Sequence, residues 1–117
     1  MNNKDIHLDL LRLLESNPEY TQRELSKEMG VSLGKVNYCM RKLIDKGMIK
    51  LKNFSKNPNK AGYMYLLTSK GIEEKTRLTF SFLKIKIKEY EDLKKEISLL
   101  QQDAAQIKSG NNISSVS

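Results

Sequence analysis

Residues 21–48, TQRELSKEMGVSLGKVNYCMRKLIDKGM, contain the pattern that decides the fold. Thr21, followed three residues later by Glu24, predicts a capping box in which each side chain bonds the backbone N–H of the other residue, so a short helix begins here. Gly30 supplies the positive φ that ends this helix, and Ser32 is a good N-cap for a second one. Two helices joined by such a tight turn form a helix-turn-helix.

The second helix of this pair has two different faces. Apolar side chains recur at helical spacing on one face and predict a core contact: Val36, Cys39, Met40, Leu43 and Ile44. The other face is polar, and residues 34–42 include no acid. Asn can make a bidentate contact with adenine, Arg and Lys with guanine, and a major groove admits one helix. We therefore favour a DNA-reading face over the alternative, an αα-hairpin with a solvated face, which would be expected to alternate Glu with Lys.

The basic charge of the chain is concentrated around these helices. The 117 residues have a formal net charge of +7, and residues 20–62 contain ten basic and three acidic residues, so this segment alone accounts for the excess. A local basic patch indicates a polyanionic partner, with nucleic acid ahead of an anionic membrane. The single cysteine excludes an intramolecular disulfide and is typical of the reducing cytoplasm. Asp9 and Arg12 interrupt the apolar run at residues 6–14, so we expect neither a signal peptide nor a membrane span.

The segments on either side predict a winged helix. Residues 5–16 have an apolar stripe at helical spacing and predict a first core helix, which Asn17-Pro18 ends. After Gly47 the apolar period changes from 3.6 to 2, and the turn-rich residues 53–62 separate two such runs, which predicts a β-hairpin with a long tip. Lysines in and beside this tip can contact phosphates or a minor groove. An isolated hairpin of this kind would be an ordinary exposed loop, but directly after a helix-turn-helix we predict a wing.

A long helix is predicted from Thr68 onward, because Gly71 and Gly110 are separated by neither Pro nor Gly. Its apolar residues recur at steps of three and four, and about 35 residues would span roughly 50 Å, further than so small a domain can cover. We expect two chains to bury this stripe as a homodimer. The alternative is that the first half packs on the domain and the rest frays. The interface residues we expect are Phe80, Leu83, Ile87, Tyr90, Leu93, Ile97 and Leu100.

Catalysis and metal binding find little support in the sequence. His7 and Cys39 are the only residues of their types, and nothing predicts contact between them, so we expect core or rim positions for both. The sequence has no cluster of four residues that could bind zinc. Residues 30–35 lack the spacing of a phosphate-binding loop. We therefore predict no enzyme activity, no catalytic residue, no metal and no cofactor. A redox role of Cys39 remains an open alternative, although the chain has no resolving cysteine.

These patterns combine into one expected organisation, mainly α with a small β-hairpin. We predict a winged helix-turn-helix domain at residues 1–70, with the recognition helix at about 32–46 and the wing at about 49–67, a C-terminal dimerisation helix at 71–108 and a disordered tail at 109–117. The DNA contacts expected on the recognition helix are Ser32, Gly34, Lys35, Asn37, Tyr38, Arg41 and Lys42. Those expected at the start of the preceding helix are Thr21, Gln22 and Arg23, and those expected in the wing are Lys52, Lys56, Asn59 and Lys60.

Three segments resemble a known family. SLGKVNYCMRKLIDKG at 32–47, KNFSKNPNKAGYMYLLTSKGIEEK at 52–75 and RLTFSFLKIKIKEYEDLKKEI at 77–97 are similar to the MarR-type winged-helix regulators of bacteria, and most of all to the exopolysaccharide (EPS)-associated MarR subgroup. The resemblance implies a transcriptional regulator that binds a palindromic double-stranded DNA operator as a homodimer and controls exopolysaccharide genes. The alternative is a protein-interaction scaffold whose long helix recruits a partner. Neither the operator nor an inducer ligand can be inferred from the sequence.

The chain departs from the broader family at two points. Asn59 and Ala61 occupy the wing positions where that family usually has Asp and Arg, so insertion of a wing arginine into the minor groove does not carry over. The chain is also shorter than typical members and has no clear second C-terminal helix, so neither the interleaved dimer nor the phenolic-ligand pocket carries over.

Overall fold

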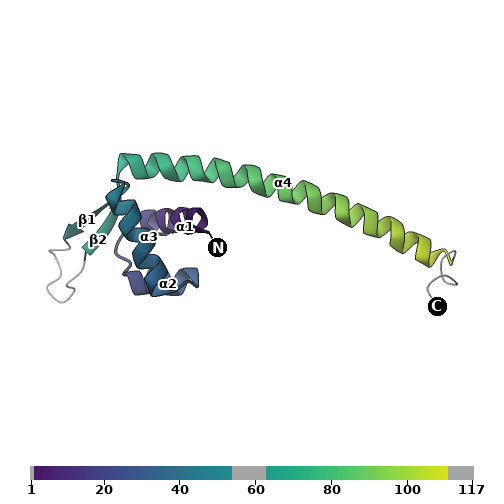
Figure 1. Ribbon diagram of the computed structural model, residues 1–117, viewed down its shortest axis with the longest axis horizontal. Helices are drawn as coiled ribbons and strands as arrows, with labels where there is room; N and C mark the ends of the chain where they lie inside the picture. The colour runs from purple at the N-terminus through teal and green to yellow at the C-terminus, as the bar shows by residue number, and fades with distance from the viewer. Residues whose placement is uncertain (1, 54–62, 111–117) are drawn as a thin grey trace. The chain divides into compact units, whose positions relative to one another are not determined.

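The computed structural model describes residues 2–53 and 63–110 and confirms the predicted fold class, a mainly helical winged helix with a long C-terminal helix. Its elements follow one another as α1 (Asn3–Ser16), α2 (Gln22–Met29), α3 (Leu33–Asp45), β1 (Ile49–Asn53), β2 (Tyr63–Leu67) and α4 (Ser69–Lys108) (Figure 1). By its contacts the chain divides into two compact units, Met1–Phe80 and Ser81–Ser117. The first unit contains the helix-turn-helix and the hairpin, so it positions the candidate site.

Local signals begin and end the first three helices. Asn2 and Asp5 form a capping box that starts α1 two residues before the predicted start. The Thr21–Glu24 box starts α2, with the Glu24 N–H donating to Thr21 Oγ1 at 3.1 Å. Gly30 then ends α2 at φ 67°, in the left-handed region that costs glycine least. The predicted turn between α2 and α3 is therefore confirmed.

The core of the first unit lies where the three helices and β1 meet. Each helix contributes the apolar side of its periodic pattern, and these side chains are fully or almost fully buried: Ile6, Leu10, Leu11 and Leu14 of α1, Leu25 of α2, Val36, Cys39, Met40 and Leu43 of α3, and Ile49 of β1. At about 1.5–3 kcal/mol for each large apolar side chain removed from water, this cluster is the main stabilising contribution to the unit. It fixes α3 by one face and leaves the opposite face to solvent.

The hairpin pairs antiparallel, with Ile49 opposite Leu67 and Asn53 opposite Tyr63. The apolar residues at alternate strand positions are not all buried. Ile49 is buried, but Leu51 is 43% exposed and Tyr63 is 58% exposed. Only the base of the hairpin therefore faces the core. Of the predicted tip at 53–62, Asn53 is the last residue of β1, and residues 54–62 lie outside the described residues.

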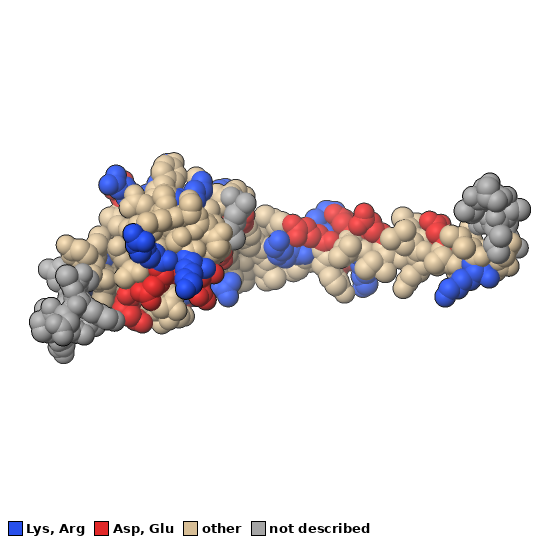
Figure 2. All heavy atoms as spheres, turned by 90° about the horizontal axis from the view of Figure 1, so that it is seen from below, with Lys and Arg blue, Asp and Glu red and all other residues tan. Residues whose placement is uncertain are grey.

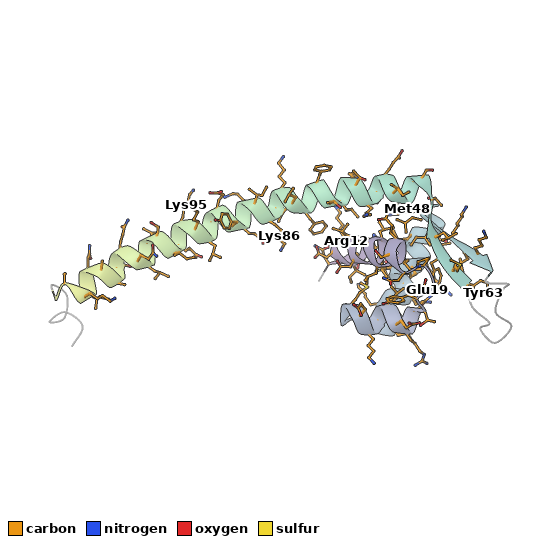
Figure 3. The ribbon with its side chains drawn as sticks, turned by 180° about the vertical axis from the view of Figure 1, so that it is seen from behind. Arg12, Glu19, Met48, Tyr63, Lys86 and Lys95 are labelled. Atoms are coloured by element: carbon orange, nitrogen blue, oxygen red, sulfur yellow. The ribbon has the colours of Figure 1, made fainter. Side chains whose placement is uncertain are left out.

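The start of α4 is joined closely to the end of α3. The Thr68 hydroxyl donates to the Gly47 carbonyl at 2.5 Å, and the Thr68 N–H donates to the Met48 carbonyl at 3.0 Å. A Cβ at Gly71 would lie 2.1 Å from the Met48 carbonyl oxygen, so only glycine is compatible with this approach. Figure 3 labels Met48 at this junction.

α4 runs for 40 residues, somewhat longer than predicted, and Thr68 caps it by accepting the Gly71 N–H at 3.1 Å. In the first unit its Leu78 is buried. From Leu83 to Gly110 every residue is exposed. Side chains extend from all sides of this helix in Figure 3. Within the second unit, the described helical residues therefore bury no side chain of their own.

Candidate nucleic-acid interface

The exposed face of α3 is held in place by its caps and its buried face. The Lys35 N–H donates to Ser32 Oγ at 3.1 Å and starts the helix, and Gly47 at φ 72° follows its last turn. The four apolar residues Val36, Cys39, Met40 and Leu43 are completely buried. Because Gly34, Asn37, Tyr38, Arg41 and Lys42 are exposed and Lys35 is half-exposed, the structure brings the predicted recognition-helix residues together on one accessible surface.

Tyr38 lies at the centre of this surface between two lysines. Its ring is 45% exposed, with Lys35 Nζ 5.7 Å and Lys42 Nζ 5.2 Å from the ring centroid. Both distances are within the range of a cation–π contact. The two ammonium groups are thus positioned by one aromatic ring, and the surface combines positive charge with a flat apolar face.

Asn37 is restrained by a contact from α2. Its Nδ2 donates to Gln22 Oε1 at 3.1 Å, and Gln22 Nε2 lies 3.4 Å from the Tyr65 hydroxyl, a longer and weaker hydrogen bond. The Tyr65 N–H in turn donates to the Pro18 carbonyl at 3.0 Å, which ties β2 to the connection between α1 and α2. These contacts link α3, the start of α2 and β2. The Asn37 side-chain carbonyl remains available as an acceptor beside its second N–H.

The other predicted contacts occupy two neighbouring segments. Thr21 and Arg23 are exposed at the start of α2, where the Thr21 hydroxyl is used by the capping box. Lys52 is exposed on β1 opposite Met64. Lys56, Asn59 and Lys60 lie outside the described residues. The structure therefore places the two helical groups and one of the four wing residues.

Charge on the first unit is mixed. In the view of Figure 2, Lys and Arg side chains lie beside Asp and Glu side chains over the winged-helix unit. On α3 itself, Leu33–Asp45, the only acid is Asp45 at the last residue, while Lys35, Arg41 and Lys42 are basic. The exposed face of α3 is therefore positive in character.

Two titratable residues lie behind this surface. Burial raises the pKa of the Cys39 thiol, which disfavours the reactive thiolate. His7 is buried on α1, and burial, followed by the positive charges of Lys46, Lys42 and Lys35, lowers its pKa against the opposing effect of Glu74. His7 Nε2 has no hydrogen-bond partner among the described residues. The sequence predicts a core or rim position for Cys39 and His7, and the structure places both in the core.

The described part of the chain contains neither a metal-binding cluster nor a membrane-spanning helix. Among residues 2–53 and 63–110, no three His, Cys, Asp or Glu side chains gather into a group that could hold a metal ion. None of the described helices has the length and apolar character needed to cross a membrane.

The predicted dimer residues lie on α4 with their side chains accessible. All seven are exposed, with fractions between 47% for Ile97 and 68% for Phe80. The exposed apolar stripe comprises Phe80, Leu83, Ile87, Tyr90, Leu93, Ile97 and Leu100.

The structure also points to residues that the sequence pattern did not single out. Tyr65 lies in β2, and its hydroxyl contacts Gln22. The alternation of β1 could have identified Lys50, which is exposed and lies two residues before Lys52 on the same side of the strand. No local signal could have indicated the contact of Tyr65, because its partner is 43 residues away.

Comparisons with known proteins agree with this architecture. A family described as winged helix-turn-helix DNA-binding matches residues 4–50. No curated protein sequence matches the chain.

Similar solved structures include a Staphylococcus aureus MepR–DNA complex, with a TM-score of 0.63 and 18% identity over 94% of this chain and 77% of that one. Sso10a-2, a DNA-binding protein from Sulfolobus solfataricus, gives a TM-score of 0.62 and 21% identity, and the match covers 86% of this chain and 97% of that one. A Mycobacterium tuberculosis MarR family protein in complex with salicylic acid gives a TM-score of 0.53 and 23% identity over 63% of this chain, and the match spans about half of that protein, 53%. These likenesses establish the winged-helix fold.

Proposed function

We propose that this chain is a cytoplasmic DNA-binding transcriptional regulator of the MarR type, which reads duplex DNA with the exposed face of α3. The observation that carries the proposal is the composition and geometry of that face. It presents Lys35, Asn37, Tyr38, Arg41 and Lys42 with no carboxylate between them, on a helix fixed by a fully buried opposite face. The matching family and the DNA complexes among structures of similar fold support it.

The side chains divide by the chemistry that each can supply. Asn37 has an amide suited to adenine, and Arg41 and Lys35 have donors suited to guanine. The hydrogen bond to Gln22 restricts the rotation of the Asn37 amide, so its remaining acceptor and donor are presented in one orientation. Ser32, at the helix N-terminus, Lys42 and the wing lysines supply phosphate contacts, which position the protein without reading sequence.

The assembly and the target are further parts of the proposal. The exposed apolar stripe of α4 is the basis for a homodimer, and a symmetric dimer reads a palindromic operator with half-sites about one helical turn, or 10 base pairs, apart or a multiple of this. Control of exopolysaccharide genes rests on the sequence resemblance alone. The wing contacts of Lys56, Asn59 and Lys60 likewise rest on the sequence.

The test is selection from a random double-stranded DNA library by the full chain at moderate salt, followed by titration of the retained sequence. Replacing Asn37 with Ala should cost about 1–3 kcal/mol and relax the preference at one base position. Replacing Tyr65 with Phe removes the hydroxyl that Gln22 contacts, so it should relax the same position to a smaller extent. Its effect should be absent when Asn37 is already Ala, because coupled residues are not additive.

Lys52→Ala is the matched control, since it should weaken binding to every sequence equally and lower the slope of log affinity against log salt by about 0.9. Equal weakening on all sequences by Asn37→Ala would contradict base reading and leave Asn37 as a phosphate contact. If the library yields no retained sequence, DNA recognition is wrong and a protein-interaction scaffold becomes the better account.

A further inference from the structure

Four residues of the exposed apolar stripe of α4 form a regular heptad segment together with Lys94, which is not part of the stripe. Leu83, Ile87, Tyr90, Lys94 and Ile97 follow one another at alternating steps of four and three, the spacing of the a and d positions of a coiled coil. Four of these residues are large and apolar, and each is about half exposed, from 47% to 59%. The fifth, Lys94, lies on the same face, because its Nζ is 5.7 Å from the ring centroid of Tyr90. The seam therefore has a single charged residue.

The ion pairs along this segment include neither of the two charged residues that flank the seam at Lys84 and Glu91. Lys86 is paired with Glu89 at 3.2 Å and Lys88 with Asp92 at 2.8 Å. Within the described residues 63–110, Lys84 and Glu91 take part in no ion pair. They are seven residues apart, so both occupy the same heptad position beside the seam. In Figure 2, acidic and basic side chains are interspersed along this helix.

We propose that α4 pairs with α4 of a second copy of this chain in antiparallel orientation, with Ile87 and Tyr90 of each chain packed across the two-fold axis. This rests on the homodimer of the proposed function and specifies its interface. In this register Ile87 packs against Tyr90 of the partner subunit, and Lys84 lies beside Glu91 of the partner subunit. The two-fold axis makes each contact occur twice.

Lys94 decides between the two orientations. A parallel pairing in register places Lys94 against Lys94 of the partner subunit in the seam, where two like charges would be partly removed from water. The antiparallel pairing places it against Leu83 of the partner subunit, so its apolar stem packs and its ammonium group reaches solvent. A parallel pairing would also bring Lys86 near Glu91 of the partner subunit, but Lys86 already bonds Glu89 in its own helix.

Charge exchange in the full chain tests the pairing by sedimentation equilibrium. Glu91→Lys should raise the dimer dissociation constant by roughly tenfold, because two attractive contacts per dimer become repulsive. Lys84→Glu should do the same, and the double exchange should restore the original constant. Glu96→Lys makes the same charge change on the opposite side of the helix and is the matched control, with no effect expected. Failure of the double exchange to restore dimerisation would overturn the Lys84–Glu91 contact.

Disulfide cross-linking tests the orientation. Residues 83 and 94 of one chain are about 16 Å apart on a helix, beyond the reach of a disulfide, so a bridge between them must join two chains. The double variant Leu83→Cys/Lys94→Cys should give cross-linked dimers on mild oxidation, while Lys94→Cys alone should not. The native Cys39 is buried and does not interfere. Cross-linking by Lys94→Cys alone would overturn the antiparallel arrangement and leave the homodimer intact.

The DNA selection described above separates this proposal from DNA recognition. A chain that remains monomeric at micromolar concentration would overturn both the antiparallel pairing and the homodimer. A monomeric chain would not contradict DNA recognition by α3, because the residues of that face lie in the other unit. The DNA selection tests that recognition separately.

Discussion

The faces of α3 and α4 are opposites in what they leave exposed. α3 buries most of its predicted inner face completely, with only Ile44 partly exposed, and presents polar and basic side chains to solvent. α4, beyond its first turns, presents large apolar side chains such as Ile87 and Tyr90 to solvent and buries none of them. The packing of α3 is complete within one chain, whereas that of α4 is not.

The difference indicates two kinds of recognition. A polar face on a rigid helix is suited to a hydrated, charged partner, because its side chains are positioned before binding. An apolar face that is left in water gains about 1.5–3 kcal/mol for each large side chain that becomes fully buried, so it favours association with another apolar surface. The proposed function assigns the first surface to DNA and the second to another copy of the chain.

The largest expected effect comes from comparing a leucine in each helix. Leu43 of α3 is completely buried, so Leu43→Ala should lower the free energy of unfolding by about 2–5 kcal/mol. Leu99 of α4 is 61% exposed, and Leu99→Ala should change it by less than about 0.5 kcal/mol. Urea denaturation followed by circular dichroism measures both. Equal losses of unfolding free energy would mean that the outer part of α4 is packed as tightly as α3, which would contradict the difference between the two helices.

A smaller effect is expected from the glycine in the first turn of each helix. Gly71→Ala would force a Cβ against the Met48 carbonyl oxygen, so it should cost about 1–3 kcal/mol of stability. Nothing lies within 4 Å of a Cβ at Gly34, and Gly34→Ala should raise stability by up to about 1 kcal/mol through helix propensity. The denaturation midpoints of the two variants should thus move in opposite directions. A neutral Gly71→Ala would show that α4 does not approach Met48 so closely.

The smallest effect concerns His7, which faces charges from both helices: Lys46, Lys42 and Lys35 of the α3 segment and Glu74 of α4. Burial lowers its pKa in the folded state, so below the ordinary value of 6.5 the unfolded chain binds more protons than the folded one. Stability should therefore be highest above this value and fall as the pH decreases through it. Thermal melts between about pH 5 and about pH 8 measure this dependence.

His7→Gln provides the control, because glutamine does not titrate in this range. Its stability profile should be flatter than that of the original chain over the same interval. Identical profiles would show that His7 accepts a proton in the folded state without cost, and that the lowered pKa is wrong.

Much of the fold could be predicted from the sequence because its signals are local. The box formed by Thr21 and Glu24, the positive φ of Gly30 and the cap at Ser32 each depend on residues within four positions, and the structure confirms them. The Asn2–Asp5 box was missed although it follows the same rule, which shows that such a signal is easily overlooked near a terminus.

The rest depends on contacts between distant residues. The approach of Gly71 to Met48 and the contact of Gln22 with Tyr65 are set by how the elements pack, and no spacing in the sequence encodes them. The exposure of Leu51 and Tyr63 also depends on packing. Alternating apolar and polar residues indicate the two sides of a strand, but they do not determine how far the core extends along it. For the candidate site, the pattern predicted which α3 residues share a face, but the restraint on Asn37 required the structure.

The junction at Thr68 and Gly71 limits how this sequence can vary. Position 68 needs a hydroxyl that both donates to the Gly47 carbonyl and accepts from the Gly71 N–H, and position 71 must lack a Cβ. Of the twenty amino acids, only Thr and Ser satisfy the first requirement at this size, and only Gly satisfies the second. A substitution at either position therefore also disturbs Gly47 and Met48, the residues that connect α3 to β1.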